Sequence, residues 1–371
     1  MSSKINVLIV DDSLFIRTYL NRVLSADENI GTVKMANDGA AALSILTTYK
    51  PDVITLDVEM PRMNGLETLS IIKKRYNIPV IMVSALTRKG ADITIKSLEL
   101  GAIDWIQKPD DAFDLTSHDR LKLELLQKIQ LAVKKEATSP QAEKLATTTY
   151  AVVDRDNITK EQFRQHVKES NWEPKGNVQL DFSLVAIGIS TGGPSALNQI
   201  IPVLPDDLNA AVIIVQHMPS TFTKVLAERL NDISKMNIKE AEDEDVIERG
   251  YVYIIPGDKH FRIKEEGRNT MKIKLDSYAK VGGFRPSAET LFYFVAEAAK
   301  SNSIGIIMTG MGNDGSENIG LIKQYSGKTI AQDEESCVIF GMPKAAINKG
   351  NINFVLPLNK IVDKIKELVI K

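Results

Sequence analysis

The chain has 371 residues, 43% hydrophobic and 25% charged, which is typical of globular proteins, and its length predicts two or three domains. Its 46 basic and 48 acidic residues give a net charge of −2 without a basic segment, which argues against nucleic-acid binding. The single cysteine, Cys337, excludes an intrachain disulfide and a cysteine-cluster zinc site, and only four histidines could supply an imidazole: His118, His166, His217 and His260.

The N-terminus carries no sign of a secretory signal. Met1–Lys4 leads directly into the strand-like run Ile5–Val10, without the separate apolar segment of a signal peptide. No apolar run approaches the roughly 18–20 residues of a transmembrane helix. We therefore expect a cytoplasmic protein that does not insert directly into a membrane.

Buried strands alternate with helices along the first hundred residues. The apolar runs that predict strands are Ile5–Val10, Val53–Leu56 and Pro79–Val83. Helical spacing is found in Leu14–Leu24, Ala40–Leu46, Leu66–Ile72 and Ile93–Leu100, and again over 115–134. This alternation predicts a doubly wound parallel sheet whose functional site lies at the carboxyl ends of the strands.

Polar side chains follow these strands at the predicted edge. They are Asp11, Asp12, Asp57, Ser84 and Lys108. Three carboxylates at one edge would repel each other unless a cation neutralises them, and such an oxygen-rich set suits Mg²⁺. The alternative is a set of helix-capping carboxylates with a surface lysine. We favour the magnesium site because all five of these polar positions agree.

The run Asp57–Gly65, with Asp11-Asp12 before it and Lys108-Pro109 after it, resembles a response-regulator receiver domain over about residues 4–109. The resemblance implies a flavodoxin-like fold, which we extend to residues 4–134 to include the last helix. It implies that Asp57 accepts a phosphoryl group from a histidine kinase and that Asp11, Asp12 and Asp57 hold Mg²⁺.

The same resemblance implies three switch residues. Ser84 and Lys108 would sense the aspartyl phosphate, and Trp105 stands where the family usually has a switch aromatic. Considered without the family, Trp105 would more often be a core residue.

Residues 135–180 are predicted to form a linker because their composition turns polar, with a loop-like run at 137–140. A short amphipathic helix is expected over Thr159–Glu169, with His166 on its solvated side. Trp172 could dock on a domain surface or remain a partly exposed linker aromatic, and the sequence favours neither.

A second α/β domain is predicted from residue 181 to 371, with apolar strands at Leu184–Ile189, Ala211–Val215 and Ile304–Met308. Between the first of these and the next helix lies the glycine-rich turn Gly188–Pro194, with Ser190 at its centre. A dinucleotide loop would need glycine at 190 and an acid after the next strand. An α/β-hydrolase elbow fits Gly188–Gly192 but requires a late histidine.

A serine nucleophile in the order Ser, His, Asp fits better. His217 closes the strand next to the one that leads to Ser190, and Asp314 follows the strand Ile304–Met308. A lone histidine is usually structural, but this one has an acid and a serine at neighbouring strand ends. His260 lies in a hairpin-like stretch, where we expect it to shape a loop or touch substrate.

With the motifs Gly188–Pro194, Gln216–Pro219, Arg285-Pro286-Ser287 and Met308–Gly315, the second domain closely resembles the catalytic domain of bacterial chemotaxis protein-glutamate methylesterases. The match spans about residues 182–356 and implies a three-layer α/β/α fold with a mainly parallel sheet. Two departures are visible. Glu289 stands where the family is expected to have aspartate, and the linker is long.

The resemblance implies a hydrolase that demethylates glutamate γ-methyl esters on chemoreceptors, releasing methanol, and deamidates specific receptor glutamines for adaptation in chemotaxis. Ser190 would be the nucleophile, His217 the general base and Asp314 its orienting acid, with Thr191, Gly192 and Met311 supporting the oxyanion site. No cofactor is expected in this domain. The family also suggests that the unphosphorylated receiver covers the catalytic face and that phosphorylation at Asp57 weakens this contact.

Two other functions remain open. The motifs specify acyl chemistry better than the acyl group, so the domain could hydrolyse another protein or small-molecule ester. A non-catalytic, receiver-linked binding module is the second alternative, which loss of Ser190, His217 or Asp314 would have favoured.

Overall fold

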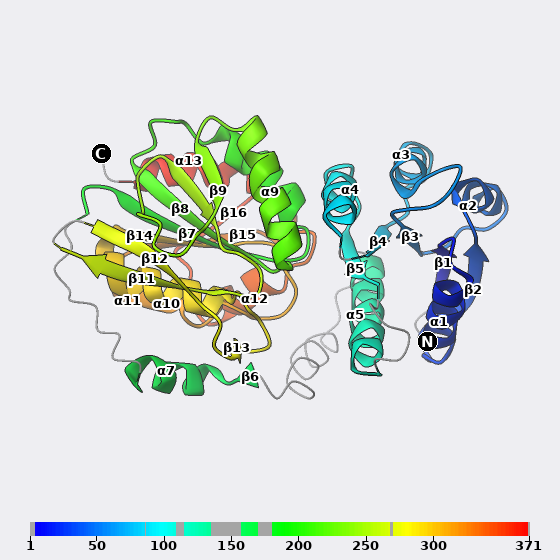
Figure 1. The fold of residues 1–371 in the computed structure, drawn as a ribbon, viewed down its shortest axis with the longest axis horizontal. Coiled ribbons are helices and arrows are strands. Elements are labelled where there is room, and N and C mark those ends of the chain that lie inside the picture. The colour runs from blue at the N-terminus through cyan, green and yellow to red at the C-terminus, as the bar shows by residue number, and fades with distance from the viewer. Residues whose placement is uncertain are drawn as a thin grey trace. The chain divides into compact units, whose positions relative to one another are not determined.

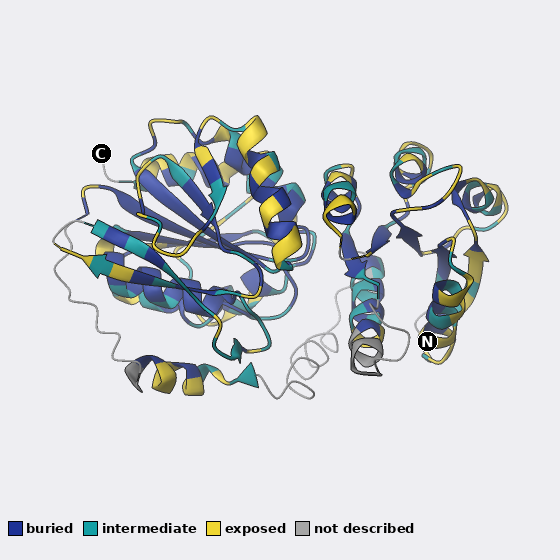
Figure 2. Ribbon diagram, in the orientation of Figure 1, coloured by how far each residue is buried: buried dark blue, intermediate teal, exposed yellow. Residues whose placement is uncertain are grey.

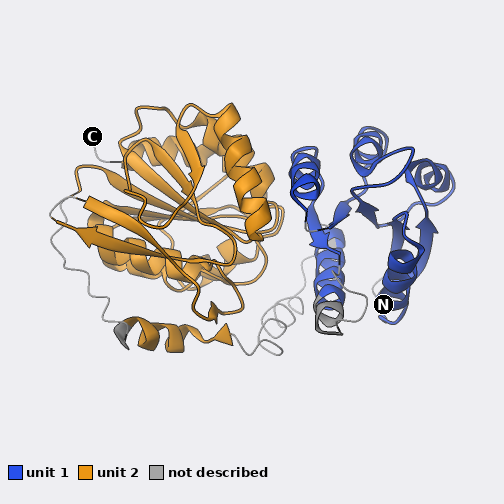
Figure 3. Ribbon diagram, viewed as in Figure 1, with its two compact units in different colours: residues 1–142 blue, residues 143–371 orange. Residues whose placement is uncertain are grey.

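The computed structural model describes residues 4–85, 87–108, 115–134, 157–169, 180–267 and 270–369, with the side chains of 115–120, 134 and 168–169 left out. The chain divides into two compact units, residues 1–142 and 143–371 (Figure 3). Within the described residues, no helix is both long and apolar enough to cross a membrane.

The first unit is a five-stranded parallel sheet with the order β2-β1-β3-β4-β5 (Figure 1). This is the flavodoxin-like order that the sequence led us to expect. Its strands are β1 (Ile5–Val10), β2 (Ile30–Ala36), β3 (Val53–Asp57), β4 (Val80–Ser84) and β5 (Asp104–Gln107). Its helices are α1 (Leu14–Ser25), α2 (Gly39–Leu46), α3 (Gly65–Arg75), α4 (Arg88–Glu99) and α5 (Leu115–Lys134).

Helices α1 to α4 each begin at a polar side chain that accepts a hydrogen bond from a backbone N–H of the first turn. The capping residues are Ser13, Asp38, Asn64 and Thr87. At α3 the cap is reciprocal, because Glu67 also accepts from the Asn64 N–H. Each cap fixes the residue at which its helix begins, and α1 and α4 begin only a few residues after the strands that lead to Asp11 and Ser84.

The second unit contains a seven-stranded parallel sheet with the order β16-β15-β14-β7-β8-β10-β9. Its strands are β7 (Ser183–Ile189), β8 (Ala210–Gln216), β9 (Asn237–Glu240), β10 (Tyr251–Ile254), β14 (Ser303–Ile307), β15 (Lys328–Gln332) and β16 (Phe354–Leu356). An antiparallel hairpin, β11 (His260–Glu266) and β12 (Thr270–Asp276), lies outside this sheet. Two short strands, β6 (Asn157–Ile158) and β13 (Lys280–Val281), pair with each other.

Helices cover both faces of the seven-stranded sheet, which gives the expected three-layer α/β/α arrangement (Figure 1). They are α8 (Gly193–Ile200), α9 (Ser220–Ile233), α10 (Ala288–Ala299), α11 (Ile319–Gln324), α12 (Met342–Asn348) and α13 (Leu358–Leu368), with 3₁₀ turns at Ile201–Val203 and Lys300–Asn302. Every residue of β7, β8 and β14 is buried, as Figure 2 shows. Such continuous burial is why these strands appear in the sequence as unbroken apolar runs.

Helix α7 (Lys160–Glu169) forms where an amphipathic helix is predicted in the linker. Its Phe163 and Val167 are buried in the core of the second unit, and Phe163 packs edge-on against Tyr293 at 5.6 Å. His166 is exposed, as expected, with its ring 4.8 Å from that of Tyr278. Residues 157–169, which the sequence analysis assigns to the linker, therefore pack with the second unit. Trp172 lies outside the described residues.

Candidate active site

In the receiver, the carboxyl ends of β1, β3 and β5 bring two buried carboxylates and one ammonium together. Lys108 Nζ lies 2.7 Å from Asp57 Oδ2 and 2.9 Å from Asp11 Oδ2. Asp11 and Asp57 are almost fully buried, whereas Asp12 is exposed. The three carboxylates each offer an oxygen within 4.8 Å of the others.

This donor set fits a hard divalent cation. Asp12, Asp57, Ser84 and Lys108 line one pocket, so Asp57 and two of the three expected switch residues open onto a common space, whereas Trp105 does not line it. An all-oxygen set with one exposed member suits Mg²⁺, which keeps several waters as ligands. Asp11, Asp12 and Asp57 would hold the ion, which would neutralise charge as a phosphoryl group approaches Asp57.

The electrostatics of the receiver site raise the pKa of both buried carboxylates. Burial, with the neighbouring Asp11 charge, raises the pKa of Asp57 to about 6, against the lowering effect of Lys108. Burial likewise raises the pKa of Asp11. The two carboxylates together raise the pKa of Lys108 against its own burial, which keeps that side chain charged.

Trp105 is buried on β5, so its side chain belongs to the core of the receiver. Lys128 of α5 lies 5.9 Å from the centre of its ring and donates to its backbone carbonyl. The same lysine pairs with Asp104 at 3.2 Å and Glu124 at 2.8 Å. Trp105 thus connects β5 to the last receiver helix.

In the second domain, Ser190 follows the last residue of β7 and lies opposite His217 at the sheet edge. The two strands pair through Ile189 and Gln216, so the next residue of each is Ser190 and His217. The His217 N–H donates to the Ile189 carbonyl at 3.2 Å, and the Gln216 side chain donates to the Ser190 carbonyl at 3.0 Å. These bonds fix the backbone on both sides of the serine hydroxyl.

The turn after Ser190 requires glycine. Gly192 has a φ of +78° and begins α8, and a Cβ there would lie 2.5 Å from Val338 Cβ. Gly310, from the loop after β14, approaches so closely that its Cβ would lie 2.8 Å from Ser190 Cβ. The glycines therefore allow two loops to meet around the serine.

His217 and Asp314 form the central contact of the site. His217 Nε2 lies 2.8 Å from Asp314 Oδ2, with both side chains buried. The other ring nitrogen, Nδ1, is buried and has no hydrogen-bond partner among the residues that the structure describes. The ring stacks on Phe284, with centroids 4.1 Å apart and an interplanar angle of 12°. The hydrogen bond of Nε2 to Asp314 and the stacking on Phe284 together orient the imidazole. Nδ1 is therefore the nitrogen that can accept a proton from a donor.

Asp314 is held at the N-terminus of α10. The hydroxyl of Ser287, the capping residue of that helix, donates to Asp314 Oδ1 at 2.7 Å, and the Ala288 N–H donates to Oδ2 at 2.6 Å. Burial raises the pKa of Asp314, but the contacts with His217 and Ser287 outweigh it, and the pKa lies below its usual value. The site therefore holds an ionised carboxylate against the imidazole.

The residues expected to support an oxyanion surround this edge. Thr191 and Met311 are buried, and the Thr191 carbonyl accepts from the Thr309 hydroxyl at 2.9 Å. Within the described chain, neither the Gly192 nor the Met311 amide donates to another protein group. Both are thus available as donors at a strand-to-helix turn.

Two residues left open by the sequence have structural contacts. Glu289 is fully buried and accepts from the Asn318 N–H at 2.7 Å and the Glu317 N–H at 3.2 Å. His260 is buried and stacks on Tyr278, with Nε2 3.1 Å from the Ala279 carbonyl. Burial lowers the pKa of His260 to about 3, so it stays neutral and shapes the loop.

Sequence reasoning missed the roles of Phe284 and Ser287. Ser287 could have been found as a helix cap, because it precedes the helical run Ala288–Ala299. Nothing local indicated that this cap would hold Asp314, which is 27 positions away, or that Phe284 would stack on His217.

Two family models match the chain: a response regulator receiver domain over residues 7–118 and a CheB methylesterase over residues 185–365. Together with the fold, they define a response regulator whose output domain is a hydrolase. A protein-glutamate methylesterase/protein-glutamine glutaminase from Pyrococcus horikoshii is 42% identical over 369 residues, covering 100% of this chain and 95% of the relative. The chain belongs to this family of protein-glutamate methylesterases/protein-glutamine glutaminases.

Other similar proteins include a protein of the same description from Thermotoga maritima, 40% identical over 98% of both chains. The crystal structure of the Thermotoga maritima CheB methylesterase catalytic domain is 45% identical and covers 50% of this chain and 98% of that one, with a TM-score of 0.49. The family and enzyme class expected from the sequence are confirmed. The individual site residues stay predictions.

Proposed function

We propose that this chain hydrolyses glutamate γ-methyl esters on chemoreceptors and deamidates specific receptor glutamines, using Ser190, His217 and Asp314. The observation that carries the proposal is the 2.8 Å contact between His217 and Asp314, opposite Ser190 at the same sheet edge. Full-length relatives named for the same two activities support the choice of acyl group over other esters.

The reaction begins when Ser190 Oγ attacks the side-chain carbonyl of the substrate. His217 takes the hydroxyl proton at Nδ1, because Nε2 is bonded to Asp314. Asp314 stabilises the imidazolium that forms, and its own hydrogen bonds from α10 keep it ionised. The same Nδ1 proton then goes to the leaving methoxide oxygen, which departs as methanol, or to the leaving amide nitrogen of a glutamine, which departs as ammonia. Water hydrolyses the acyl-enzyme to free glutamate.

The negative charge that develops on the carbonyl oxygen needs donors at the glycine-rich turn. The Gly192 and Met311 amides, with Thr191 holding the turn in place, are our candidates. Each such donor contributes roughly 10²–10³ in rate in other acyl-transfer enzymes.

The receiver regulates this reaction through phosphorylation of Asp57. A chemotaxis histidine kinase would supply the phosphoryl group, with Mg²⁺ held by Asp11, Asp12 and Asp57, and Ser84 and Lys108 would contact the phosphate. Trp105 would transmit the change toward α5. A kinase and receptor tails on the inner side of the membrane would place the enzyme in the cytoplasm.

The test is methanol release from methyl-labelled receptor membranes by the wild-type chain and by Ser190→Ala. We expect a loss of at least 10³-fold, because the variant lacks the nucleophile. Ser195→Ala, in the first turn of α8, is the matched control and should retain wild-type activity. Release by Ser190→Ala at the wild-type rate would refute the assignment. Wild-type activity on generic esters but not on receptors would redirect it to another substrate.

A further inference from the structure

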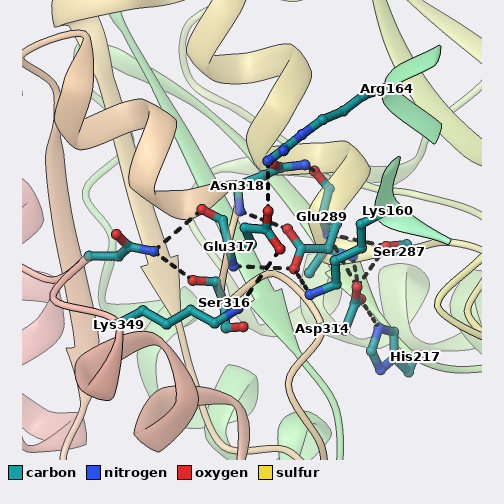
Figure 4. Close-up of polar contacts among 12 residues, drawn as sticks. Lys160, Arg164, His217, Ser287, Glu289, Asp314, Ser316, Glu317, Asn318 and Lys349 are labelled. Carbon is teal, nitrogen blue, oxygen red and sulfur yellow. Dashed lines mark hydrogen bonds and ion pairs between the residues drawn. The ribbon is translucent and has the colours of Figure 1, made fainter. Parts of the chain in front are cut away.

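Lys160, at the start of α7, contacts Glu289, a residue that in turn contacts Asp314. Lys160 Nζ forms an ion pair with Glu289 Oε1, a carboxylate that is fully buried (Figure 4). Glu289 lies on the first turn of α10, two residues after Ser287, and its N–H approaches Asp314 Oδ1 at 3.3 Å. A continuous chain of polar contacts thus runs from Lys160 through Glu289 to Asp314 and His217.

The position of Lys160 is unfavourable for its own helix. It is the first residue of α7, where the helix dipole disfavours a positive charge. Its side chain is only 23% exposed. A lysine at an unfavourable position in a helix is commonly retained for a contact outside that helix. For Lys160 this contact is the ion pair with Glu289.

Glu289 needs this partner. Both of its oxygens accept from nitrogen donors: Oε1 from Lys160 and the Glu317 N–H, and Oε2 from the Asn318 N–H. This is the pattern of an ionised carboxylate. Burial and the neighbouring Asp314 charge raise the pKa of Glu289, and Lys160 and the Asn318 amide oppose that rise. Without Lys160, a buried anion next to Asp314 would lose its countercharge.

The same segment also supports the other side of the imidazole. Asn157 Oδ1 accepts from the Gly283 N–H at 2.8 Å, and the Ile158 carbonyl accepts from the Gly282 N–H at 3.1 Å. These glycines precede Phe284, the ring on which His217 stacks. Residues 157–160 therefore contact the supports of both partners of the His217–Asp314 pair.

We propose that Lys160 is a positioning residue of this enzyme: by pairing with Glu289 it sets the charge and the placement of Asp314 beside His217. This inference rests on the function proposed above. It makes the end of the interdomain linker part of the active-site architecture, although Lys160 itself does not contact the reacting groups.

Several other charged groups lie around this network. Facing Glu289 are Lys160 and Arg164 from α7, Asp314 and Glu317 from the loop after β14, and Lys349 after α12. Facing Asp314 are His217, Lys160, Glu289 and the neutral His260. Lys160 is the cation paired with a fully buried member of the set, whereas Arg164 pairs at 2.8 Å with the partly exposed Glu317.

The decisive experiment compares the full-length Lys160→Met and Glu289→Gln variants by NMR titration of His217 and by the pH dependence of kcat and KM. The chain has only four histidines, so the imidazole signals can be assigned with a His217→Ala variant. Removing the positive charge should move the His217 titration midpoint, and the acid limb of kcat/KM, upward by roughly 0.5–1 pH unit. Removing the negative charge should move both downward by a similar amount.

The double variant Lys160→Met/Glu289→Gln should return the midpoint to within about 0.3 of wild type, because the two charge changes cancel. Lys160→Arg should retain the wild-type midpoint.

For Lys160→Met we expect a fall in kcat of about tenfold with KM within twofold, since Lys160 does not contact substrate. Arg164→Gln, on the same helix but in an exposed ion pair, is the matched control and should shift the midpoint by less than about 0.2.

Opposite shifts in the two single variants cannot come from a general loss of stability, so they support the proposal. Unchanged midpoints, with only a lower unfolding temperature, would overturn it and leave the ion pair a purely structural contact. If Lys160→Met does not fold, Glu289→Gln alone decides, because it removes the buried charge at 289 and leaves Lys160 partly exposed to solvent. Should the wild-type chain release no methanol, the proposed function would fail while the NMR titration still tested the inference about Lys160.

Discussion

Asp57 in the receiver and Asp314 in the catalytic domain are both buried carboxylates beside a nitrogen base, yet their pKa values move in opposite directions. Burial and the Asp11 charge raise the pKa of Asp57 to about 6. Hydrogen bonds from His217, Ser287 and α10 bring that of Asp314 below its ordinary value. Asp57 opens onto a pocket and has one polar contact on each oxygen, with the Glu59 N–H and Lys108, whereas Asp314 has two on each oxygen.

The difference matches what each carboxylate would do in the proposed function. A carboxylate that forms a bond to phosphorus needs access to a pocket, and Lys108 offsets only part of the electrostatic cost of its burial. A carboxylate that only orients an imidazole does best when every lone pair is occupied. We therefore expect Asp57 to couple its site to pH and metal, and Asp314 to remain ionised throughout the working range.

The largest effect should come from Asp314→Asn, which makes the catalytic acid neutral while keeping its shape. An amide that donates to His217 Nε2 would place the ring proton on Nδ1, the nitrogen that has to accept from Ser190. We expect kcat for methanol release to fall by about 10⁴, the loss seen when the equivalent change is made in a Ser-His-Asp enzyme. The exposed Asp207→Asn is the control, and a loss below tenfold would show that Asp314 is not the orienting acid.

The pH dependence of the stability of each domain should distinguish the two carboxylates, Asp57 in the receiver and Asp314 in the catalytic domain. Asp57 binds a proton more tightly in the folded state, so its stabilising contribution is present below about pH 4 and is lost as the pH rises to about 6. In metal-free buffer this loss is up to about 3 kcal/mol. Asp314, with a lowered pKa, contributes stability that is instead lost as the pH falls below its ordinary range.

The measurement is denaturant unfolding at pH 4 and pH 7, followed by the fluorescence of Trp105 in a Trp172→Phe background. The free energy of unfolding of Asp57→Asn, relative to its parent, should increase between these two pH values. Saturating Mg²⁺ should stabilise the parent chiefly at pH 7, by about 2.7 kcal/mol at 100 times Kd, because protons compete for the same oxygens at pH 4. A difference that does not vary with pH would contradict the raised pKa of Asp57.

The smallest effect is expected from Phe284→Leu, which removes the stacked ring from His217 but keeps an apolar side chain. An aromatic pair contributes about 0.5–1.5 kcal/mol beyond its buried area, so kcat/KM should fall by up to about tenfold. The control is Phe354→Leu on β16, away from the site. Equal activities for the two variants would mean that the contact with Asp314 orients the imidazole without help from Phe284.

The sequence predicts the residues at the strand ends but not the contacts that support them, and the reason is physical. Ser190, His217 and Asp314 each follow a continuous apolar strand, and parallel strands of one sheet bring their carboxyl ends together. The same rule finds the receiver site. The supporting contacts obey no such rule, because they come from the loop at 277–287 and from a helix in the expected linker.

Lys160 and Glu289 are 129 positions apart, and no period or motif in the sequence relates them. Phe163 and Val167 indicated an amphipathic helix, but the pattern does not show which surface its apolar side meets. Glu289 was visible only as a departure from an expected aspartate. Its burial and its two backbone donors required the folded chain.

The way the His217 ring is held has a consequence for the order of events. One nitrogen is bonded to Asp314 and one face is covered by Phe284, so the ring cannot turn over during a catalytic cycle. In the proposed reaction, the proton from Ser190, the proton for methanol and the proton from the attacking water all pass through Nδ1. Methanol and water must then occupy the same position in succession. Added methanol should compete with water for the acyl-enzyme and regenerate the ester, which makes the step reversible from the product side.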